Sequence, residues 1–257
     1  MFNSNAIENS TLTLKETERI LMDLEVARDV SVREVFEAKN LAKVMEYIRG
    51  KGAALEISSE AILLLHRMLL TTIDDRIAGR FRARGEYVRV GTHVAPAPEQ
   101  VEDMISDILT EYTSDHEIYF ADAIAKFHLD FETVHPFCDG NGRIGRVLMN
   151  VQLLRFGFPV IIIRDKEKKT YYASFTEYRD TKKGKMMEKI VALALAESLH
   201  KRIAYLRGEK IITLADFAAT CLPVGTAQKK SIHTLINAAH RQTIPAFREK
   251  GEWKIGV

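Results

Sequence analysis

Apolar side chains recur at helical spacing along most of the chain, which predicts a mainly α-helical protein. In SVREVFEAKNLAKVMEYI, the residues Val35, Leu41, Val44 and Ile48 fall on one helical face. The same period predicts helices in EAILLLHRMLLTTI, PEQVEDMISDILTEY, DHEIYFADAIAKFHLDFETV and VLMNVQLLRFG, and over about residues 186–206. The sequence TLKE at residues 13–16 is typical of a capping box and predicts a further helix in LKETERILMDLEVARDV.

Two stretches depart from the helical period. In GRFRARGEYVRVGTHVAPAP, β-forming residues lie between Gly85 and Gly91, which predicts a short β-hairpin. A new pattern follows Gly208, where helices are expected in TLADFAA and SIHTLINAAHRQ, with a turn at Pro223 and Gly225 between them. IPAFREKGEWKI then predicts a second hairpin. The C-terminal residues therefore read as a separate small module.

Composition excludes several classes of protein. The chain has 257 residues, 46% of them hydrophobic, as expected for one large or two modest globular domains. Its longest apolar run, FPVIII, is far shorter than the ~20 residues of a membrane helix. The N-terminus has no secretory pattern, and Cys138 and Cys221 have no metal-like spacing. We therefore expect a cytoplasmic protein without a membrane partner.

Residues 135–146, HPFCDGNGRIGR, carry the candidate chemistry. The run Gly140-Asn141-Gly142 precedes a helical pattern, and backbone N–H groups at the start of a helix favour anions. Arg143 and Arg146 lie three residues apart, so both should project from one side of the first helical turn. Guanidinium groups match phosphate oxygens. The stretch therefore predicts a phosphate site.

Other side chains of this stretch suit the chemistry of a nucleotide. His135 has an ordinary pKa near 6.5, which suits a general base at neutral pH. Asp139 could carry Mg²⁺, which commonly bridges carboxylates and phosphates. We interpret Cys138 as a packing residue, because no step calls for a nucleophilic thiol. A histidine alone, or a glycine-rich turn alone, would not indicate a functional site, but here the two occur together.

The complete pattern H-x-F-x-D-G-N-G-R-x-x-R resembles the Fic family. Further segments resemble the parts of Fic proteins around this motif, namely HLDFETVHPF, GRFRARGEYVRVG, VAPAPEQVEDMI and FGFPVIIIRDKEKKTYYASF. The resemblance covers about residues 30–200. It implies an all-helical core with a β-hairpin flap, and transfer of AMP from ATP to a hydroxyl group of a target protein.

The resemblance also implies roles for residues of the motif. His135 would deprotonate the hydroxyl, and Phe137 would pack inward. Asp139 would ligate Mg²⁺ against the α- and β-phosphates of ATP. The backbone of Gly140, Asn141 and Gly142 would form an anion-binding nest for the phosphates. Arg143 would bind the β- and γ-phosphates, and Arg146 would bind the γ-phosphate.

The hairpin would be the flap on which a target segment docks by adding a strand. The residues offering that edge are Tyr87, Val88, Arg89 and Val90. The region is basic, with arginines at positions 80, 82, 84 and 89. These arginines either protect the edge or favour acidic targets, and an ordinary hairpin that covers the core is the simpler alternative.

Residues 4–9, SNAIEN, fit the inhibitory pattern of Fic proteins, [S/T]-x-x-x-E-[G/N]. Ser4 and Glu8 share one face if the segment is helical. The resemblance implies that Glu8 pairs with Arg146 and denies it to the γ-phosphate. The alternative is a frayed polar terminus.

We therefore expect a mostly α fold with three parts. Residues 1–52 would form N-terminal helices with the inhibitory segment, residues 53–207 the Fic catalytic core, and residues 208–257 a winged helix-turn-helix module similar to excisionases. That module carries Lys229, Lys230, Arg241, Arg248, Lys250 and Lys254 against Glu249 and Glu252, a net charge of 6 − 2 = +4. Such a face suits DNA, although small winged modules also dock proteins.

Three functions stay open at this point. The leading hypothesis is a self-inhibited protein adenylyltransferase that uses ATP and Mg²⁺. The same site could instead remove AMP from a modified protein, with Glu8 positioning a water molecule. In a third hypothesis, nucleotide binding only gates DNA binding by a regulator. The sequence names neither the target protein nor the type of residue modified, and it leaves open whether the chain forms a homo-oligomer.

Overall fold

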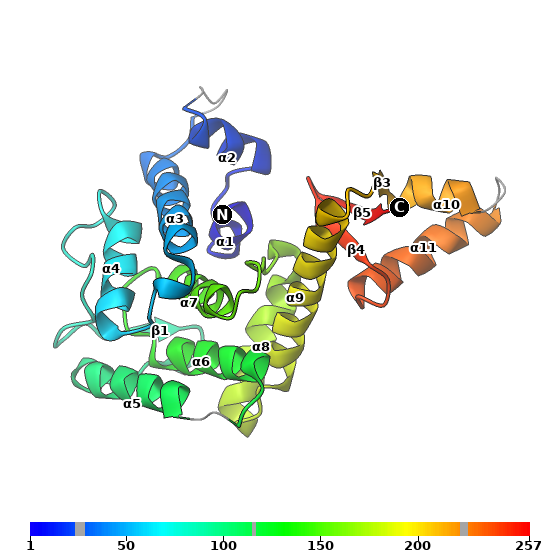
Figure 1. The fold of residues 1–257 in the computed structure, drawn as a ribbon. Coiled ribbons are helices and arrows are strands. Elements are labelled where there is room, and N and C mark those ends of the chain that lie inside the picture. The colour runs from blue at the N-terminus through cyan, green and yellow to red at the C-terminus, as the bar shows by residue number, and fades with distance from the viewer. Residues whose placement is uncertain (24–28, 115–116, 222–225) are drawn as a thin grey trace. The chain divides into compact units, whose positions relative to one another are not determined.

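The computed structural model describes residues 1–23, 29–114, 117–221 and 226–257, and it is mainly helical, as the apolar pattern predicts (Figure 1). Contacts divide it into two compact units, residues 1–157 with 162–188, and residues 158–161 with 189–257. Helix α9 (Lys185–Leu206) contributes its residues after Glu188 to the second unit. The domain boundaries predicted from the sequence, after residues 52 and 207, differ from this division by contacts. They stay a prediction.

The first unit is built from helices joined by short loops. Its α-helices are α1 (Phe2–Ile7), α2 (Leu14–Leu21), α3 (Val32–Lys51), α4 (Ser59–Leu70), α5 (Val101–Ser114), α6 (Phe120–Val134), α7 (Asn141–Arg155) and α8 (Lys168–Thr181). Short 3₁₀ helices are η1 (Gly52–Ala54), η2 (Pro98–Gln100) and η3 (Asp165–Glu167). The capping box of Thr13 and Glu16 is confirmed. Helix α2 ends at Leu21, and part of the helix predicted there falls at residues 24–28, outside the described residues.

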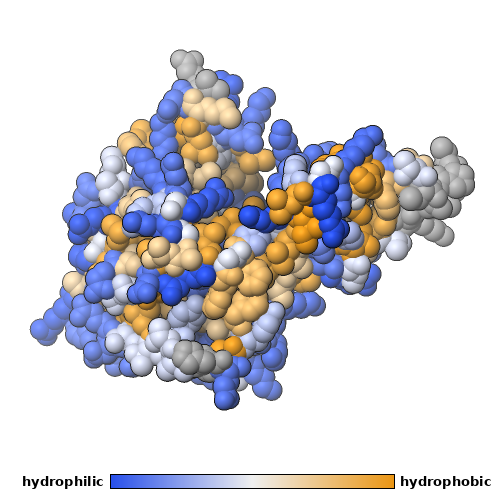
Figure 2. Space-filling model, in the orientation of Figure 1, coloured by the Kyte–Doolittle hydropathy of each residue, from blue (hydrophilic) through white to orange (hydrophobic). Residues whose placement is uncertain are grey.

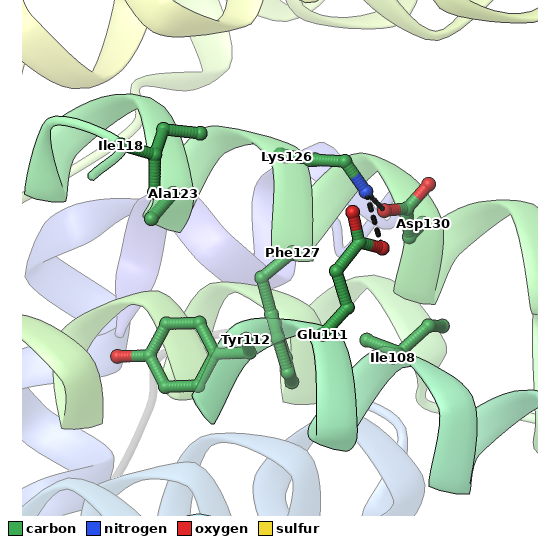
Figure 3. Close-up of a pocket in the computed structure, with 8 residues that line it drawn as sticks. All are labelled: Ile108, Glu111, Tyr112, Ile118, Ala123, Lys126, Phe127 and Asp130. Carbon is green, nitrogen blue, oxygen red and sulfur yellow. Dashed lines mark hydrogen bonds and ion pairs between the residues drawn. The ribbon is translucent and has the colours of Figure 1, made fainter. Parts of the chain in front are cut away.

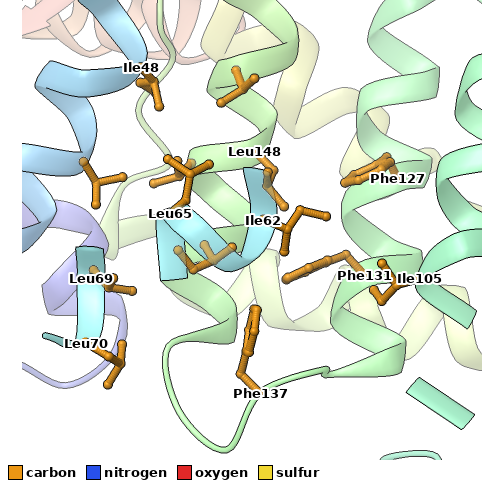
Figure 4. Close-up of a cluster of buried hydrophobic side chains, with 14 of the residues drawn as sticks. Ile48, Ile62, Leu65, Leu69, Leu70, Ile105, Phe127, Phe131, Phe137 and Leu148 are labelled. Carbon is orange, nitrogen blue, oxygen red and sulfur yellow. The ribbon is translucent and has the colours of Figure 1, made fainter. Parts of the chain in front are cut away.

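Helix α7 lies at the centre of the first unit, packed against α3, α4 and α6. Nearly every residue from Asn141 to Leu153 is buried, as expected of a helix that neighbours surround. The main apolar cluster gathers side chains from these helices and includes Leu65, Phe131 and Leu148. Figure 4 shows these side chains converging, with the Phe137 ring pointing into the cluster from the loop before α7. The core therefore fixes the start of α7, where the candidate phosphate site lies.

The predicted hairpin is present, with strands shorter than its β-forming residues suggest. Strand β1 (Arg89–Val90) pairs antiparallel with β2 (His93–Val94). Gly91 makes the turn at a φ of 59°. Figure 2 shows hydrophilic and hydrophobic residues side by side on this face. Over the ranges that the structure describes, none of the helices is both long and apolar enough to span a bilayer.

Besides the end of α9, the second unit contains a three-stranded antiparallel sheet and two helices. Its elements are β3 (Ile211–Thr213), α10 (Leu214–Cys221), α11 (Thr226–His240), β4 (Ala246–Glu249) and β5 (Glu252–Gly256), with strand order β3-β5-β4. Thr213 caps α10 by accepting a hydrogen bond from the Asp216 backbone at 3.0 Å. The helices and hairpin agree with the sequence pattern, but strand β3 was not predicted. The predicted turn at Pro223 and Gly225 lies outside the described residues.

Candidate active site

The loop from His135 to Gly140 joins α6 to α7 and has left-handed residues at both ends. His135 has φ 51° and ψ 61°, and its backbone N–H donates to the Phe131 carbonyl at 2.9 Å, which closes α6. Gly140 has φ 84° and precedes the first residue of α7. The two turns bring His135, Asp139 and the N-terminus of α7 into one short segment. The helix predicted after Gly140 is therefore confirmed, since α7 begins at Asn141.

Buried side chains hold this loop in place. The Asn141 side chain accepts from the backbone N–H of Phe137 and donates to its carbonyl, both at 2.8 Å. The Phe137 ring stacks on His66 with centroids 3.7 Å apart. Burial lowers the pKa of His66 to about 4, so the ring is neutral at pH 7. Its Nδ1 accepts from Gly79 at 3.0 Å, which leaves Nε2 to donate to the Asp139 carbonyl at 3.0 Å.

His135 is a nearly buried, neutral imidazole. Its side chain is 15% exposed, and Nδ1 lies 3.7 Å from Oε2 of Glu132. The pKa of His135 is lowered to about 4, mainly by burial and also by the charges of Arg82 and His93, whereas a hydrogen bond with the Glu132 backbone and the charge of Glu8 act to raise it. A neutral ring with Nδ1 turned towards Glu132 leaves Nε2 as the nitrogen that can accept a proton.

The two arginines of the motif reach different neighbours, although the sequence suggested one common side. Arg143 contacts Glu37 of α3 at 3.1 Å and Asp139 at 2.9 Å. Its side chain is 3% exposed, and Nε has no hydrogen-bond partner among the described residues. A buried guanidinium nitrogen without a partner is uncommon, and it suits an anion at this place.

Arg146 reaches the N-terminal helix instead. Its Nε donates to the Ser4 hydroxyl at 2.9 Å, and Nη2 donates to the Ser4 carbonyl at 2.9 Å and to Oε1 of Glu8 at 2.8 Å. Nη1 lies 3.4 Å from the Tyr171 hydroxyl. Burial works against the charge, but Tyr171 and Glu8 outweigh it and raise the pKa of Arg146. The pair of Glu8 and Arg146 thus exists as the pattern of residues 4–9 suggested.

Helix α1 is fixed in this position by α8. The Tyr172 hydroxyl donates to the Ile7 carbonyl at 3.3 Å, and Lys168 donates to the Asn9 side chain at 2.8 Å. Ile7 is fully buried. The Glu8 carboxylate lies so close to Gly142 that a Cβ on this glycine would overlap with it. The N-terminal residues are therefore a docked helix, with a carboxylate at the start of α7.

Both carboxylate oxygens of Asp139, the residue predicted to carry Mg²⁺, contact donors of the protein. Oδ1 accepts from the Gly140 backbone at 2.5 Å and from Arg143, and Oδ2 contacts Arg33 of α3. Burial raises the pKa of Asp139, but Arg143 and Arg33 outweigh it and lower the pKa, so the group is a carboxylate. Among the described residues, no cluster of three His, Cys, Asp or Glu side chains could hold a metal. One carboxylate with phosphate oxygens is nevertheless a usual Mg²⁺ arrangement.

An open depression lies beside Asp139. Its volume is about 580 Å³, within the range of small-molecule sites, and its lining includes Arg33, Arg80 and Cys138. A second cavity, between α5 and α6, is far smaller at about 20 Å³ (Figure 3). There Lys126 bridges Glu111 and Asp130 at 2.8 and 2.7 Å. The small cavity has room for about one water molecule, so it is no candidate for a nucleotide.

The hairpin presents an exposed edge near His135. The exposed fractions are 68% for Tyr87 and 46% for Val90. Val88 accepts a hydrogen bond from the Ala95 backbone at 3.1 Å, and Arg89 donates to the Gly91 carbonyl at 3.0 Å. The side chain of His93 contacts the Thr133 carbonyl at 2.9 Å, which ties the hairpin to the end of α6.

Arg82 corrects the interpretation of the hairpin arginines. It is 3% exposed, so it neither protects an edge nor meets a target. Its guanidinium donates to four backbone carbonyls, those of Val134, His135, Glu86 and Pro96. Arg80 forms two 2.7 Å hydrogen bonds with Glu86. Both arginines therefore organise the connection between α4 and the hairpin.

Cationic side chains of the second unit are partly engaged within the unit. Lys254 pairs with Glu249 at 3.2 Å, and Lys201 pairs with the same carboxylate at 2.8 Å. Arg248 lies 4.7 Å from the centre of the Trp253 ring. The side chains at positions 229 and 230 are outside the described residues. Arg248 and Lys254 therefore have partners within the unit, and the net charge of +4 counted from the sequence already includes Glu249.

Sequence reasoning missed several residues of the site. Arg33 and Glu37 contact motif side chains, and Glu132, His66 and Arg82 surround His135 and its loop. One signal was available for His66 and Glu132, because each is a polar residue within an apolar helical stretch. For Arg33, Glu37 and Arg82 the partners lie far away in sequence, and no local pattern indicates them.

Comparison with known proteins agrees with this geometry. Residues 56–153, which include the loop and most of α7, match the Fic/DOC family. The chain is 35% identical over 181 residues to protein adenylyltransferase Fic of Drosophila willistoni, covering 67% of this chain and 35% of that protein. Identity to the Nematostella vectensis protein of the same name is also 35%, over 179 residues, 67% of this chain and 41% of that protein. The chain thus spans about two fifths or less of these relatives.

A solved structure extends the similarity beyond the matched residues. Fic-1 from C. elegans is 29% identical to this chain and superposes with a TM-score of 0.68, covering 80% of this chain and 62% of that one. The superposition therefore includes helices on both sides of the motif. Together with the histidine loop and the arginines of α7, these similarities identify residues 56–153 as a Fic/DOC family domain.

Proposed function

We propose that this chain is a protein adenylyltransferase, which transfers AMP from ATP to a Ser, Thr or Tyr hydroxyl of a target protein. The relatives named protein adenylyltransferase Fic support this proposal. The observation that carries it is the loop from His135 to Gly140, which sets a neutral imidazole beside the first turn of α7. A general base next to an anion site is what attack on a phosphate by a hydroxyl requires.

The reaction would proceed in one displacement. Nε2 of His135 takes the proton of the target hydroxyl, whose oxygen forms a bond to the α-phosphorus of ATP. The bond from this phosphorus to the bridging oxygen breaks, and pyrophosphate leaves with the electron pair. Arg143 and the N-terminal N–H groups of α7 would hold the leaving phosphates, because charge accumulates there. Mg²⁺ at Asp139 would supply further neutralisation of phosphate charge.

The resting state would be inhibited by α1. Arg146 donates three hydrogen bonds to Ser4 and Glu8, so its guanidinium is not available to a γ-phosphate. A hydrogen bond between charged groups contributes about 1.5–3 kcal/mol. At 1.36 kcal/mol for each factor of ten, release of Glu8 would change the rate by about tenfold to a hundredfold.

Target docking would use the exposed edge of β1. Tyr87, Val88, Arg89 and Val90 precede or form this strand, and an extended target segment could pair with it by backbone hydrogen bonds. The tie between His93 and the Thr133 carbonyl keeps the hairpin close to His135. Strand addition would therefore bring a target hydroxyl towards Nε2 without demanding a particular target sequence.

Removal of AMP from a modified protein is a second candidate function. It is favoured by the position of Glu8, whose carboxylate lies against Gly142 at the start of α7. A carboxylate at this place could activate a water molecule for attack on the phosphorus of AMP–protein. Under this hypothesis Glu8 is essential, whereas under the transfer hypothesis it is inhibitory.

The C-terminal module would serve a partner, DNA or protein, rather than the reaction. Its sheet and helices form a cluster of their own around Leu214, Ala239 and Ile255. Deleting residues 211–257 should therefore leave self-modification intact. A truncated protein that folds but cannot modify itself would assign the module to the catalytic unit.

The decisive experiment measures label from α-³²P ATP. Glu8→Gly protein with Mg²⁺ and a cell lysate should label itself or a target more than the unsubstituted chain does. Adding His135→Ala should abolish labelling while ATP binding persists, and the exposed-site change Glu102→Gln serves as a matched control. If the variant with His135→Ala were labelled as strongly as Glu8→Gly protein, the mechanism would be refuted. AMP released from a pre-labelled target only when Glu8 is present would instead support removal.

A further inference from the structure

A buried carboxyl group beside His135 has no role in the displacement described above. Glu132 lies in the last turn of α6, and its side chain is 11% exposed. Its Oε2 faces Nδ1 of His135 at 3.7 Å, which is beyond hydrogen-bond distance. A small rotation of the carboxyl would bring the two atoms into contact.

The fold makes room for this carboxyl. A Cβ built on Gly145 of α7 would lie 2.6 Å from Oε1 of Glu132 and 2.7 Å from Cε1 of His128. Oε1 is buried, and within the described part of the chain it has no hydrogen-bond partner. A glycine thus accommodates a carboxyl that lacks a full set of partners. Buried polar groups of this kind are rare in purely structural positions.

The charged and titratable groups around Glu132 come from four elements. Glu8 directly follows α1, Arg146 lies on α7, Tyr171 and Tyr172 lie on α8, and His128 and His135 lie on or next to α6. The pKa of Glu132 is raised to about 8, mainly by burial and also by the charge of Glu8, while Arg146 opposes both. Burial and Arg146 lower the pKa of His128 to about 3. In the resting protein at pH 7, Glu132 is therefore largely uncharged.

We propose that Glu132 is a positioning residue for His135, whose carboxylate accepts a hydrogen bond from Nδ1 once α1 and Glu8 have left. This inference rests on the proposed function, because it assigns the base of that reaction its partner. The departure of Glu8 removes a neighbouring negative charge and admits water, and both changes favour the ionised form of Glu132. Arg146 stays as a counter-charge.

The hydrogen bond would have two consequences for the base. It would hold the proton on Nδ1 and so keep Nε2 free for the target hydroxyl. The charge of Glu8 itself acts to raise the pKa of His135 in the resting protein, so the departure of Glu8 alone would lower that pKa. A Glu132 carboxylate that accepts from Nδ1 would more than replace this effect and raise the pKa of His135 above about 4, and a base is more effective when its pKa is close to the working pH. The inhibitory helix would then act on the reaction twice, by holding Arg146 and by keeping His135 a weak base.

The test compares the full chain with Glu8→Gly and with Glu8→Gly plus Glu132→Gln. In Glu8→Gly protein, NMR titration should move the pKa of His135 from about 4 towards its ordinary value of about 6.5. Adding Glu132→Gln should return it towards the resting value. The same addition should lower kcat by between about tenfold and a hundredfold and leave the KM for ATP unchanged, whereas Glu132→Asp restores part of kcat.

Several outcomes separate this proposal from its alternatives. The proposal would be overturned if the pKa of His135 were the same in Glu8→Gly protein and in Glu8→Gly plus Glu132→Gln protein. It would also be overturned if these two proteins had the same kcat and the same pH profile. Failure of Glu8→Gly protein to transfer AMP would refute the proposed function, while the NMR titration would still decide whether Glu132 and His135 pair. If Glu132→Gln does not fold, the comparison of the unsubstituted chain with Glu8→Gly alone remains decisive, and an unmoved His135 pKa refutes the proposal.

Discussion

Replacement of Arg82 by methionine should be among the most destabilising single changes near the site. The guanidinium donates to the carbonyls of His135 at 2.9 Å, Glu86 at 3.0 Å, Pro96 at 2.9 Å and Val134 at 3.3 Å. Methionine has a similar length but no donor, so it would leave these carbonyls unpaired in a place that water hardly reaches. The change tests whether one side chain joins the hairpin to the histidine loop.

The size of the effect follows from the number of hydrogen bonds. Each hydrogen bond contributes about 1 kcal/mol net of water, so four of them set the expected loss at about 4 kcal/mol. For a unit of this size, 1 kcal/mol corresponds to about 2–4 °C in Tm. Arg82→Met should therefore lower the Tm of the unit that contains it by about 8–16 °C.

Thermal unfolding followed by circular dichroism measures this shift, and Arg84→Met is the matched control. The Arg84 side chain is 93% exposed and lies 4.0 Å from Glu99, and an ion pair at such a surface position contributes at most about 1 kcal/mol. The control should lower Tm by about 4 °C at most. A shift of that small size for Arg82→Met, or equal shifts for both variants, would refute the anchoring role. At a temperature where the fold survives, Arg82→Met should also reduce transfer more than ATP binding, because His135 loses its support.

Three further predictions concern control, metal and pH. Glu8→Gly should raise the rate of transfer by about tenfold to a hundredfold. The double variant Glu8→Gly with Arg146→Ala should have the rate of Arg146→Ala alone, since the effects of substitutions at contacting residues are not additive. Additive effects on the initial rates would show that Glu8 does not act through Arg146. Asp139→Ala should remove the effect of Mg²⁺ on ATP binding in calorimetry, and an unchanged metal response would place the ion elsewhere. The free energy of unfolding should rise as the pH increases from about 4 to 6.5. In this range His66 binds a proton in the unfolded chain, whereas in the folded protein its pKa is about 4 and the buried ring stays neutral. His66→Gln should make this slope shallower in urea titrations, and an equally steep slope would show that His66 is not buried in neutral form.

The histidine loop could be predicted from the sequence because its structure is determined locally. Gly140 adopts the left-handed conformation that glycine allows, and Asn141 binds the backbone of Phe137 four residues away. The helices with a clear apolar period were predicted for the same reason. Helix α8 was not, because its sequence KTYYASFTEYRD mixes aromatic and polar residues without a clear apolar stripe. Its burial depends on contacts such as that of Tyr171 with His128, 43 residues away in the chain.

The environment of the motif could not be predicted, because its partners are distant in sequence and often are backbone groups. Arg82 contacts the His135 carbonyl across 53 residues, and a carbonyl gives no signal in the sequence. Arg143 was expected to share a side with Arg146, yet Glu37 and Asp139 attract it towards α3. Which way a long side chain points depends on the charges that tertiary packing brings near it.

Helix α7 shows why the site needs glycines within its first two turns. Gly142 and Gly145 lie three residues apart, and a Cβ on either would overlap with a carboxylate from elsewhere in the fold, that of Glu8 just after α1 or that of Glu132 of α6. Glycine in a helix is less favourable than alanine by about 1 kcal/mol, so both positions reduce the stability of the helix. The strip without side chains lets two acidic groups approach the guanidinium of Arg146. Because both acidic groups share Arg146 as their counter-charge, the presence of Glu8 influences the ionisation of Glu132. Inhibition by α1 is thereby coupled to the environment of His135.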